Sequence, residues 1–136
     1  MELRIGHLVL WQSGIERAIE LAREFIGTPI DPEKPEGARY SGAVFGKMAI
    51  FLLLFAHGMK LVYHMKLPVP KIGPGPKGGF DLLWKTPEYK LLINVPADGP
   101  ITYYGKNILE VEGSLDGVQY DFLFNMSAIF GDMIRI

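Results

Sequence analysis

The chain has 136 residues, of which 49% are apolar and 21% are charged. This length and composition are typical of one folded domain and exclude a disordered chain. We therefore treat residues 1–136 as a single domain. Fourteen basic and fifteen acidic side chains leave a net charge of −1, which gives almost no field to attract nucleic acid or an anionic membrane. We expect neither as a partner.

Cysteine is absent from the chain, so a disulfide, a thiolate nucleophile and a cysteine metal site are excluded. The first residues lack the basic start, long apolar stretch and small-residue cleavage site of a signal peptide. The strongest apolar run covers residues 48–56. It is about half as long as the roughly 20 residues that span a bilayer, so we interpret it as core. These features predict a cytoplasmic protein.

The first elements are predicted to be a strand and a helix. Residues 3–11 form an apolar run that we interpret as a strand. Ser13 and Glu16 have the spacing of a capping box, which marks a helix start, and Gly27 supplies the stop. Residues 28–38 hold three prolines and are expected to be a loop. The apolar side of the predicted helix is formed by Ile15, Ala18, Ile19, Ala22, Phe25 and Ile26.

The apolar segment after this loop is compatible with two structures. We prefer two strands, at residues 39–45 and 48–55, because the Gly-Lys pair between them suits a two-residue hairpin turn. The alternative is one buried helix over about residues 42–57. The leucine, methionine and alanine content favours this helix, and Gly58 would be its C-cap. Short apolar runs do not distinguish the two, so both remain open.

The middle of the chain is predicted to supply three further strands. Residues 59–67 alternate between apolar and polar side chains, as a half-buried strand does. Residues 68–79 contain four prolines and four glycines and are interpreted as a long connection. Residues 80–85 and 90–95 are predicted to be two strands joined by a turn.

Residues 101–124 are predicted to form an antiparallel β-meander whose last turn lies at Asp116-Gly117. A three-residue loop at 105–107 extends the same apolar face backwards. The agreement of two turns on one face is evidence, because a one-residue slip would invert the pattern. The facing pairs are Ile101–Val111, Tyr103–Leu109, Leu109–Phe124, Val111–Phe122, Gly113–Tyr120 and Leu115–Val118.

The same register gathers three carboxylates, Glu110, Glu112 and Asp121, on the polar face, with Glu112 directly opposite Asp121. Like charges that are directly opposed destabilise a sheet, so a compensating group is expected nearby. Either bulk water and basic side chains of a neighbouring strand compensate, or the site holds an acid–base pair or a metal ion. The candidate catalytic residues are Glu112, Asp121 and His64.

The segment GHLVL at residues 6–10, with the capped helix and terminal glycine that follow, resembles the opening βα unit of vicinal-oxygen-chelate proteins such as glyoxalases. In that family the strand histidine is a metal ligand. The resemblance implies a divalent-metal-dependent enzyme in which His7 and Glu110 or Glu112 hold the metal. The family repeats its βαβββ module, and residues 68–110 contain no second amphipathic helix. We therefore do not assign the chain to this family, and we predict no cofactor.

We expect an α+β fold: a strongly bent antiparallel sheet or half-barrel of about seven to nine strands with one N-terminal amphipathic helix packed against it. Such a fold often encloses an apolar cavity. The preferred function is binding of a small apolar or aromatic molecule between sheet and helix. Alternatives are the metal-dependent enzyme and a homodimeric interaction module, and a homodimer is expected. The candidate ligand contacts, which as strand aromatics are also typical core residues, are Trp11, Trp84, Tyr103 and Tyr120.

Overall fold

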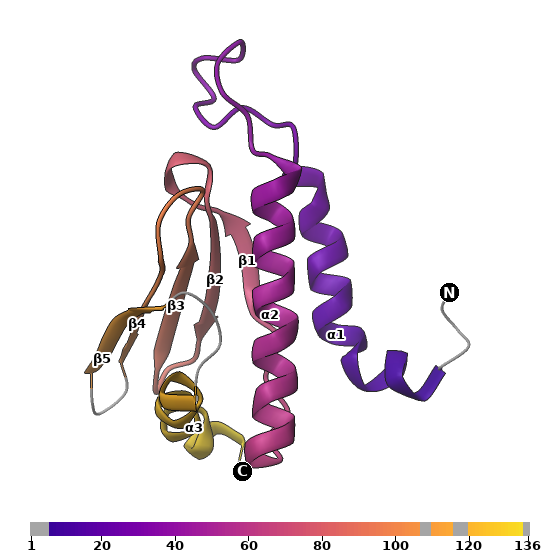
Figure 1. The fold of residues 1–136 in the computed structure, drawn as a ribbon, viewed down its shortest axis with the longest axis vertical. Helices are drawn as coiled ribbons and strands as arrows, with labels where there is room; N and C mark the ends of the chain where they lie inside the picture. Colours follow the sequence, from indigo (N-terminus) through magenta and orange to yellow (C-terminus); the bar gives the residue numbers. More distant parts are fainter. Residues whose placement is uncertain (1–5, 107–109, 116–119, 135–136) are drawn as a thin grey trace.

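The computed structural model describes residues 6–106, 110–115 and 120–134. Three α-helices accompany one open five-stranded sheet (Figure 1), so the expected α+β class is confirmed. The helices are α1 (Gly6–Ala22), α2 (Gly42–Tyr63) and α3 (Tyr120–Ile134), with short 3₁₀ turns η1 (Arg23–Phe25) and η2 (Pro76–Gly78). The strands are β1 (Lys71–Pro74), β2 (Phe80–Lys85), β3 (Lys90–Val95), β4 (Ile101–Lys106) and β5 (Glu110–Leu115).

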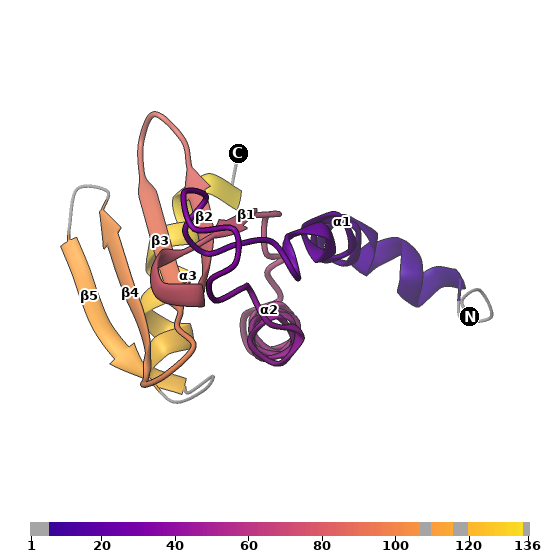
Figure 2. The same cartoon turned by 90° about the horizontal axis from the view of Figure 1, so that it is seen from above.

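The sheet is a meander in which each strand pairs antiparallel with the next one along the chain. β2 and β3 have the predicted bounds, and β1 adds a strand inside the segment that we interpreted as a connection. The helices α2 and α3 lie on one face of the sheet, which we call the inner face (Figures 1 and 2). We call the opposite face the outer face. Alternate residues of β2 and β3 are buried on the inner face, as the period of a strand requires.

The helix α2 replaces the hairpin that we preferred over residues 39–55, so the helical alternative is correct. The Ser41 hydroxyl caps its start by accepting from the Val44 N–H at 3.1 Å. The helix continues through Gly58 and ends at His64, which has a left-handed conformation with φ of 55°. The strand predicted over residues 59–67 is therefore also wrong. A run that is apolar on all sides fits a helix packed between neighbours better than a strand with one solvated face.

The helix α1 lies beside α2 and contacts the sheet at β1 (Figures 1 and 2). Ile15, Ile19 and Ala22 of the predicted apolar stripe are buried. The helix begins at Gly6 and not at Ser13, so the strand predicted over residues 3–11 is wrong from Gly6 onward. A short, mostly apolar run suits a helix as well as a strand. The single helix expected on the sheet is thus replaced by α2 and α3.

The pairing of β4 with β5 differs from the predicted register. Ile101 pairs with Leu115 and not with Val111, a shift of four residues. Because the shift is even, the assignment of side chains to the two faces survives. Ile101 and Leu115 are buried on the inner face, whereas Glu112 is exposed on the outer face.

The last strand of the predicted meander is wrong, because residues 120–124 belong to α3. The predicted partners Tyr120, Asp121 and Phe122 are therefore not strand residues, and the turn at 116–117 lies outside the described residues. The buried residues of α3 recur at helical spacing, which competes with the alternating pattern of its first five residues. These buried residues are Phe122, Leu123, Met126, Ile129 and Phe130. With these segments helical, the sheet has five strands in place of the expected seven to nine.

The core between α2 and the inner face is centred on Phe55, which is fully buried. Its ring centroid lies 4.9 Å from that of Phe122, 5.8 Å from Trp84 and 6.3 Å from Phe130. These separations are typical of tilted and edge-to-face aromatic pairs. The Trp84 indole N–H donates to the Pro68 carbonyl at 2.7 Å, which satisfies the polar atom of this buried ring. One cluster therefore joins α2, α3 and β2.

The substitution Phe55→Ala is expected to lower the free energy of unfolding by about 3–5 kcal/mol, because it leaves a cavity in this aromatic cluster. Urea denaturation followed by circular dichroism measures the change. Phe124→Ala is the matched control, because the Phe124 side chain is 64% exposed, and its effect should stay below about 1 kcal/mol. Equal losses at the two positions would contradict the described core.

Candidate functional site

The outer face of the sheet carries three rows of side chains that run across the strands, as the register requires. The central row is Lys71, Leu83, Leu92, Tyr104 and Glu112. On one side of it lies a row of Lys85, Lys90, Lys106 and Glu110. On the other side lie Asp81, Asn94, Thr102 and Ser114. The face is therefore apolar in the middle, basic towards one end of the strands and uncharged or acidic towards the other.

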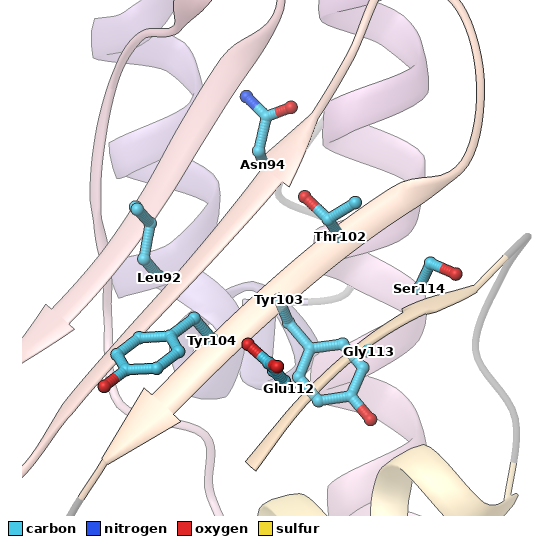
Figure 3. A pocket seen from close by; sticks show the side chains of 8 residues that line it. All are labelled: Leu92, Asn94, Thr102, Tyr103, Tyr104, Glu112, Gly113 and Ser114. Atoms are coloured by element: carbon cyan, nitrogen blue, oxygen red, sulfur yellow. The ribbon is translucent and has the colours of Figure 1, made fainter. Parts of the chain in front are cut away.

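A shallow hollow of about 560 Å³ lies over β3, β4 and β5 on this face (Figure 3). Leu92 and Tyr104 supply its apolar surface, and Glu112 supplies a carboxylate. Asn94, Thr102 and Ser114 add an amide and two hydroxyls at one end. Small-molecule sites typically combine an apolar surface with a few polar groups in this way. We call this hollow the sheet-face hollow.

Gly113 lies under the sheet-face hollow and allows the Tyr103 ring to cross β5 on the inner face. A Cβ atom at Gly113 would lie only 2.8 Å from the Tyr103 hydroxyl oxygen. The Tyr103 ring also makes an edge contact with Phe122 of α3, with centroids 5.3 Å apart. Any larger residue at position 113 would therefore displace Tyr103 and loosen the contact between the sheet and α3.

A second hollow of about 470 Å³ adjoins the first, and Tyr104 lines both. It lies beside the turn between β2 and β3 and is lined by Lys85, Lys90 and Lys106, together with Glu88 and other residues of the turn. Lys90 stands directly opposite Lys85 on one side and Lys106 on the other. Among the residues that the structure describes, none of these ammonium groups has a carboxylate oxygen within 4.0 Å. We call these three residues the lysine row. Directly opposed like charges destabilise a sheet, so an anion over the lysine row would be stabilising.

Two hydrogen bonds fix polar side chains on the outer face. The Tyr104 hydroxyl donates to a Glu110 carboxylate oxygen at 2.6 Å. This hydrogen bond is the main reason that the pKa of Tyr104 is raised above its usual 10.0, with smaller contributions from desolvation and from the charges of Glu110 and Glu112. The Asn94 amide donates to Asp81 at 2.9 Å. Glu110 and Asp81 therefore already have partners, whereas Lys85, Lys90 and Lys106 have no carboxylate partner in the part of the chain that the structure describes.

The predicted catalytic residues are not brought together. Glu112 stands opposite Tyr104 on the outer face, so its predicted pairing with Asp121 is wrong. Asp121 is in the first turn of α3, and His64 ends α2, which packs on the inner face. The sequence also predicted that basic side chains of a neighbouring strand compensate the charges of the carboxylates. His64 does not take this role from a strand, because it is the C-cap of α2.

The predicted metal ligands are also separated. His7 is in α1, which contacts the sheet at the edge strand β1, whereas Glu110 and Glu112 are in β5 at the opposite edge. Because residues 6–10 are helical, the βα unit that the resemblance to vicinal-oxygen-chelate proteins required is not formed. Within the described ranges, no group of three histidine, aspartate or glutamate side chains is placed to hold a metal ion.

The four predicted ligand contacts are distributed over the fold. Trp84 is buried in the core, and Tyr103 is half-buried between β5 and α3. Trp11 lies in α1 and Tyr120 begins α3. The expected position between the sheet and a helix is occupied by core side chains, among them the fully buried Phe55, Phe80 and Leu82.

Apart from Tyr103 and Glu112, the residues that line the two outer hollows are not among the candidate site residues chosen from the sequence. The alternation in the two predicted strands at 80–85 and 90–95 already indicates that Leu83 and Leu92 share a face. It also places Lys85 opposite Lys90 across the turn. Lys106 and Tyr104 join them only through the pairing of β3 with β4, which the sequence did not specify.

Comparisons with protein-family models, with curated proteins and with solved structures found no match for this chain. The function is therefore argued from the geometry of the outer face.

The substitution Glu110→Gln is expected to lower the pKa of Tyr104 towards 10.0, because it removes the carboxylate that opposes the phenolate. The pH titration of the Tyr104 ring carbon by NMR measures this change. Since the pKa is raised in the folded protein, the contact stabilises the fold below about pH 10, and its contribution is lost as the pH rises through the folded pKa. Glu24→Gln is the control, because Glu24 is exposed in η1 and outside both hollows, and it should leave the Tyr104 titration unchanged. An unchanged titration in Glu110→Gln would contradict the hydrogen bond.

Proposed function

We propose that this protein binds a small molecule on the outer face of its sheet. The ligand has a flat apolar or aromatic part and a negatively charged group. The observation that carries the proposal is the juxtaposition of the sheet-face hollow with a lysine row that has no carboxylate partner among the described residues. The proposal keeps the ligand class expected from the sequence and moves the site from the space under the sheet to its opposite face.

The apolar part of the ligand is proposed to lie on Leu92 and Tyr104. Both side chains are half-buried, and they are neighbours across β3 and β4. A tyrosine ring offers a rigid apolar surface at little cost in side-chain entropy. Asn94, Thr102 and Ser114 give the hollow hydrogen-bonding groups that would select among ligands of similar shape.

The negative group of the ligand is proposed to lie over Lys85, Lys90 and Lys106. An anion there interacts favourably with three ammonium groups whose mutual repulsion otherwise opposes the pairing of β2, β3 and β4. Because these side chains are exposed, each contact contributes little, and salt weakens it. The apolar contact therefore supplies most of the affinity, while the lysine row orients the ligand.

The test uses the fluorescent probe 8-anilino-1-naphthalenesulfonate, which combines aromatic rings with one negative charge. We expect saturable binding that Leu92→Ser weakens and that Lys90→Gln weakens roughly two- to fivefold, because an exposed charge contact is worth up to about 1 kcal/mol. The uncharged analogue N-phenyl-1-naphthylamine should bind more weakly than the sulfonate and should be insensitive to Lys90→Gln. Fluorescence titration gives the affinities.

Leu21→Ser is the matched control, because Leu21 is an exposed leucine on α1, away from the proposed site. It should leave the affinity unchanged. Loss of probe binding in Leu54→Ser, which changes the exposed apolar side of α2, with Leu92→Ser unaffected would place the probe elsewhere and contradict the proposal. NMR shifts of the backbone amides on adding the probe should be largest in β3 and β4.

A further inference from the structure

The two adjoining hollows of the outer face carry opposite charge, although they share Tyr104. The hollow beside the β2–β3 turn is lined by the lysine row, with Glu88 as its acidic residue. The described residues that line the sheet-face hollow include no basic side chain, and Glu112 is charged among them. Asp81 adds a second carboxylate beside this hollow, because it faces Asn94 across β2 and β3. A ligand that extends over both hollows therefore meets positive charge at one end and negative charge at the other.

The Asn94 side chain presents its carbonyl oxygen, and not its amino group, to the sheet-face hollow. Its amino nitrogen donates to Asp81 at 2.9 Å, and an ionised carboxylate can only accept. The same nitrogen lies against the segment just before β2, where a Cβ atom would be 2.9 Å from it at Gly75 and 3.4 Å at Gly79. Figure 3 shows the amide oxygen on the side of Thr102. This oxygen is therefore held in place as a hydrogen-bond acceptor.

The acceptors at this end of the strands surround Thr102. Asn94 faces Thr102 on β3, Ser114 faces it on β5, and Glu112 is its diagonal neighbour. Diagonal neighbours on a sheet are about 7–8 Å apart, so one ligand group over Thr102 can reach all of them. In the described ranges, the side chains of Thr102, Glu112 and Ser114 have no hydrogen-bond partner. An ammonium group matches them, because it donates three hydrogen bonds and its charge is opposite to that of Glu112.

We propose that the ligand is an elongated aromatic acid with a protonated amine at the end opposite its acid group. This inference rests on the proposed function, because it keeps the acid over the lysine row and the aromatic part on the apolar centre of the face. The amine lies over Thr102, where the Asn94 carbonyl oxygen and the Glu112 carboxylate receive it. The reversed orientation places like charges together, so the ligand binds in one direction only.

The separation of the two polar ends sets the length of this ligand. Lys90 and Asn94 are four residues apart on β3, which corresponds to about 13 Å at about 3.3 Å per residue. The flexible lysine stem lets the ammonium group lean over the centre of the face and shortens the span that the ligand must cover. Two linked aromatic rings with a polar group at each end suit this distance. A free α-amino acid carries both charges on one carbon and cannot reach both hollows.

Three biphenyl-4-carboxylates test the inference, with an aminomethyl, a hydroxymethyl or a methyl group at the 4′ position. The amine is protonated at neutral pH and should bind roughly three- to fivefold more tightly than the alcohol, which is the limit for an exposed charge contact. Glu112→Gln should abolish this difference, because it removes the charge and keeps the shape. Asn94→Ala should weaken both compounds and leave the methyl compound unchanged. NMR titration of the full chain gives the affinities.

Glu24→Gln is the matched control, because Glu24 is an exposed carboxylate in η1, outside both hollows. It should leave all three affinities unchanged, and circular dichroism checks that every variant is folded. Equal affinity for the amine and the alcohol, or a preference for the amine that survives Glu112→Gln, would overturn this inference. If Lys90→Gln still weakened the methyl compound, the proposed ligand site would stand. If none of the three compounds bound, or none responded to Lys90→Gln, the inference and the proposed function would both fail.

Discussion

The contact between α2 and the inner face of the sheet is the interaction on which the rest of the structure depends. Phe55 joins α2 to Trp84 of β2 and to the two α3 aromatics Phe122 and Phe130. Burial of this cluster decides which face of the meander is inside. A two-layer arrangement of this kind buries one face of the sheet and leaves the other accessible.

The exposed surfaces follow from the same contact. Because the inner face is used for packing, the side chains available for a ligand are those of the outer face, where Tyr104 belongs to the central row and borders the lysine row. Because α2 packs on the sheet with one side only, its other side is left exposed with Ile50, Leu54 and Leu61. The proposed ligand site and this exposed side of α2 therefore lie on opposite sides of one molecule.

The strands that could be predicted from the sequence are those joined by a short turn. The segments 80–85 and 90–95 alternate cleanly around a short turn, and they form β2 and β3 with the predicted bounds. The faces of β4 and β5 were also predictable, since an even shift of register preserves the alternation. Within the candidate site, this local pattern identifies Leu83 with Leu92, and Lys85 with Lys90, as neighbours on the outer face of β2 and β3. It does not identify Lys106 or Tyr104 as their neighbours.

The sequence by itself determined the α+β class and the strands β2 and β3, because period-two alternation and turn residues act over a few residues. Only the tertiary structure decided that residues 42–63 and 120–134 are helices, because an apolar run can be buried in either form and its neighbours select between them. That choice separated Glu112 from Asp121 and His7 from both. It also left one side of α2 exposed, because the other side packs on strands that are far from α2 in the chain. The lysine row needed only the pairing of β3 with β4, which brought Lys106 opposite Lys90.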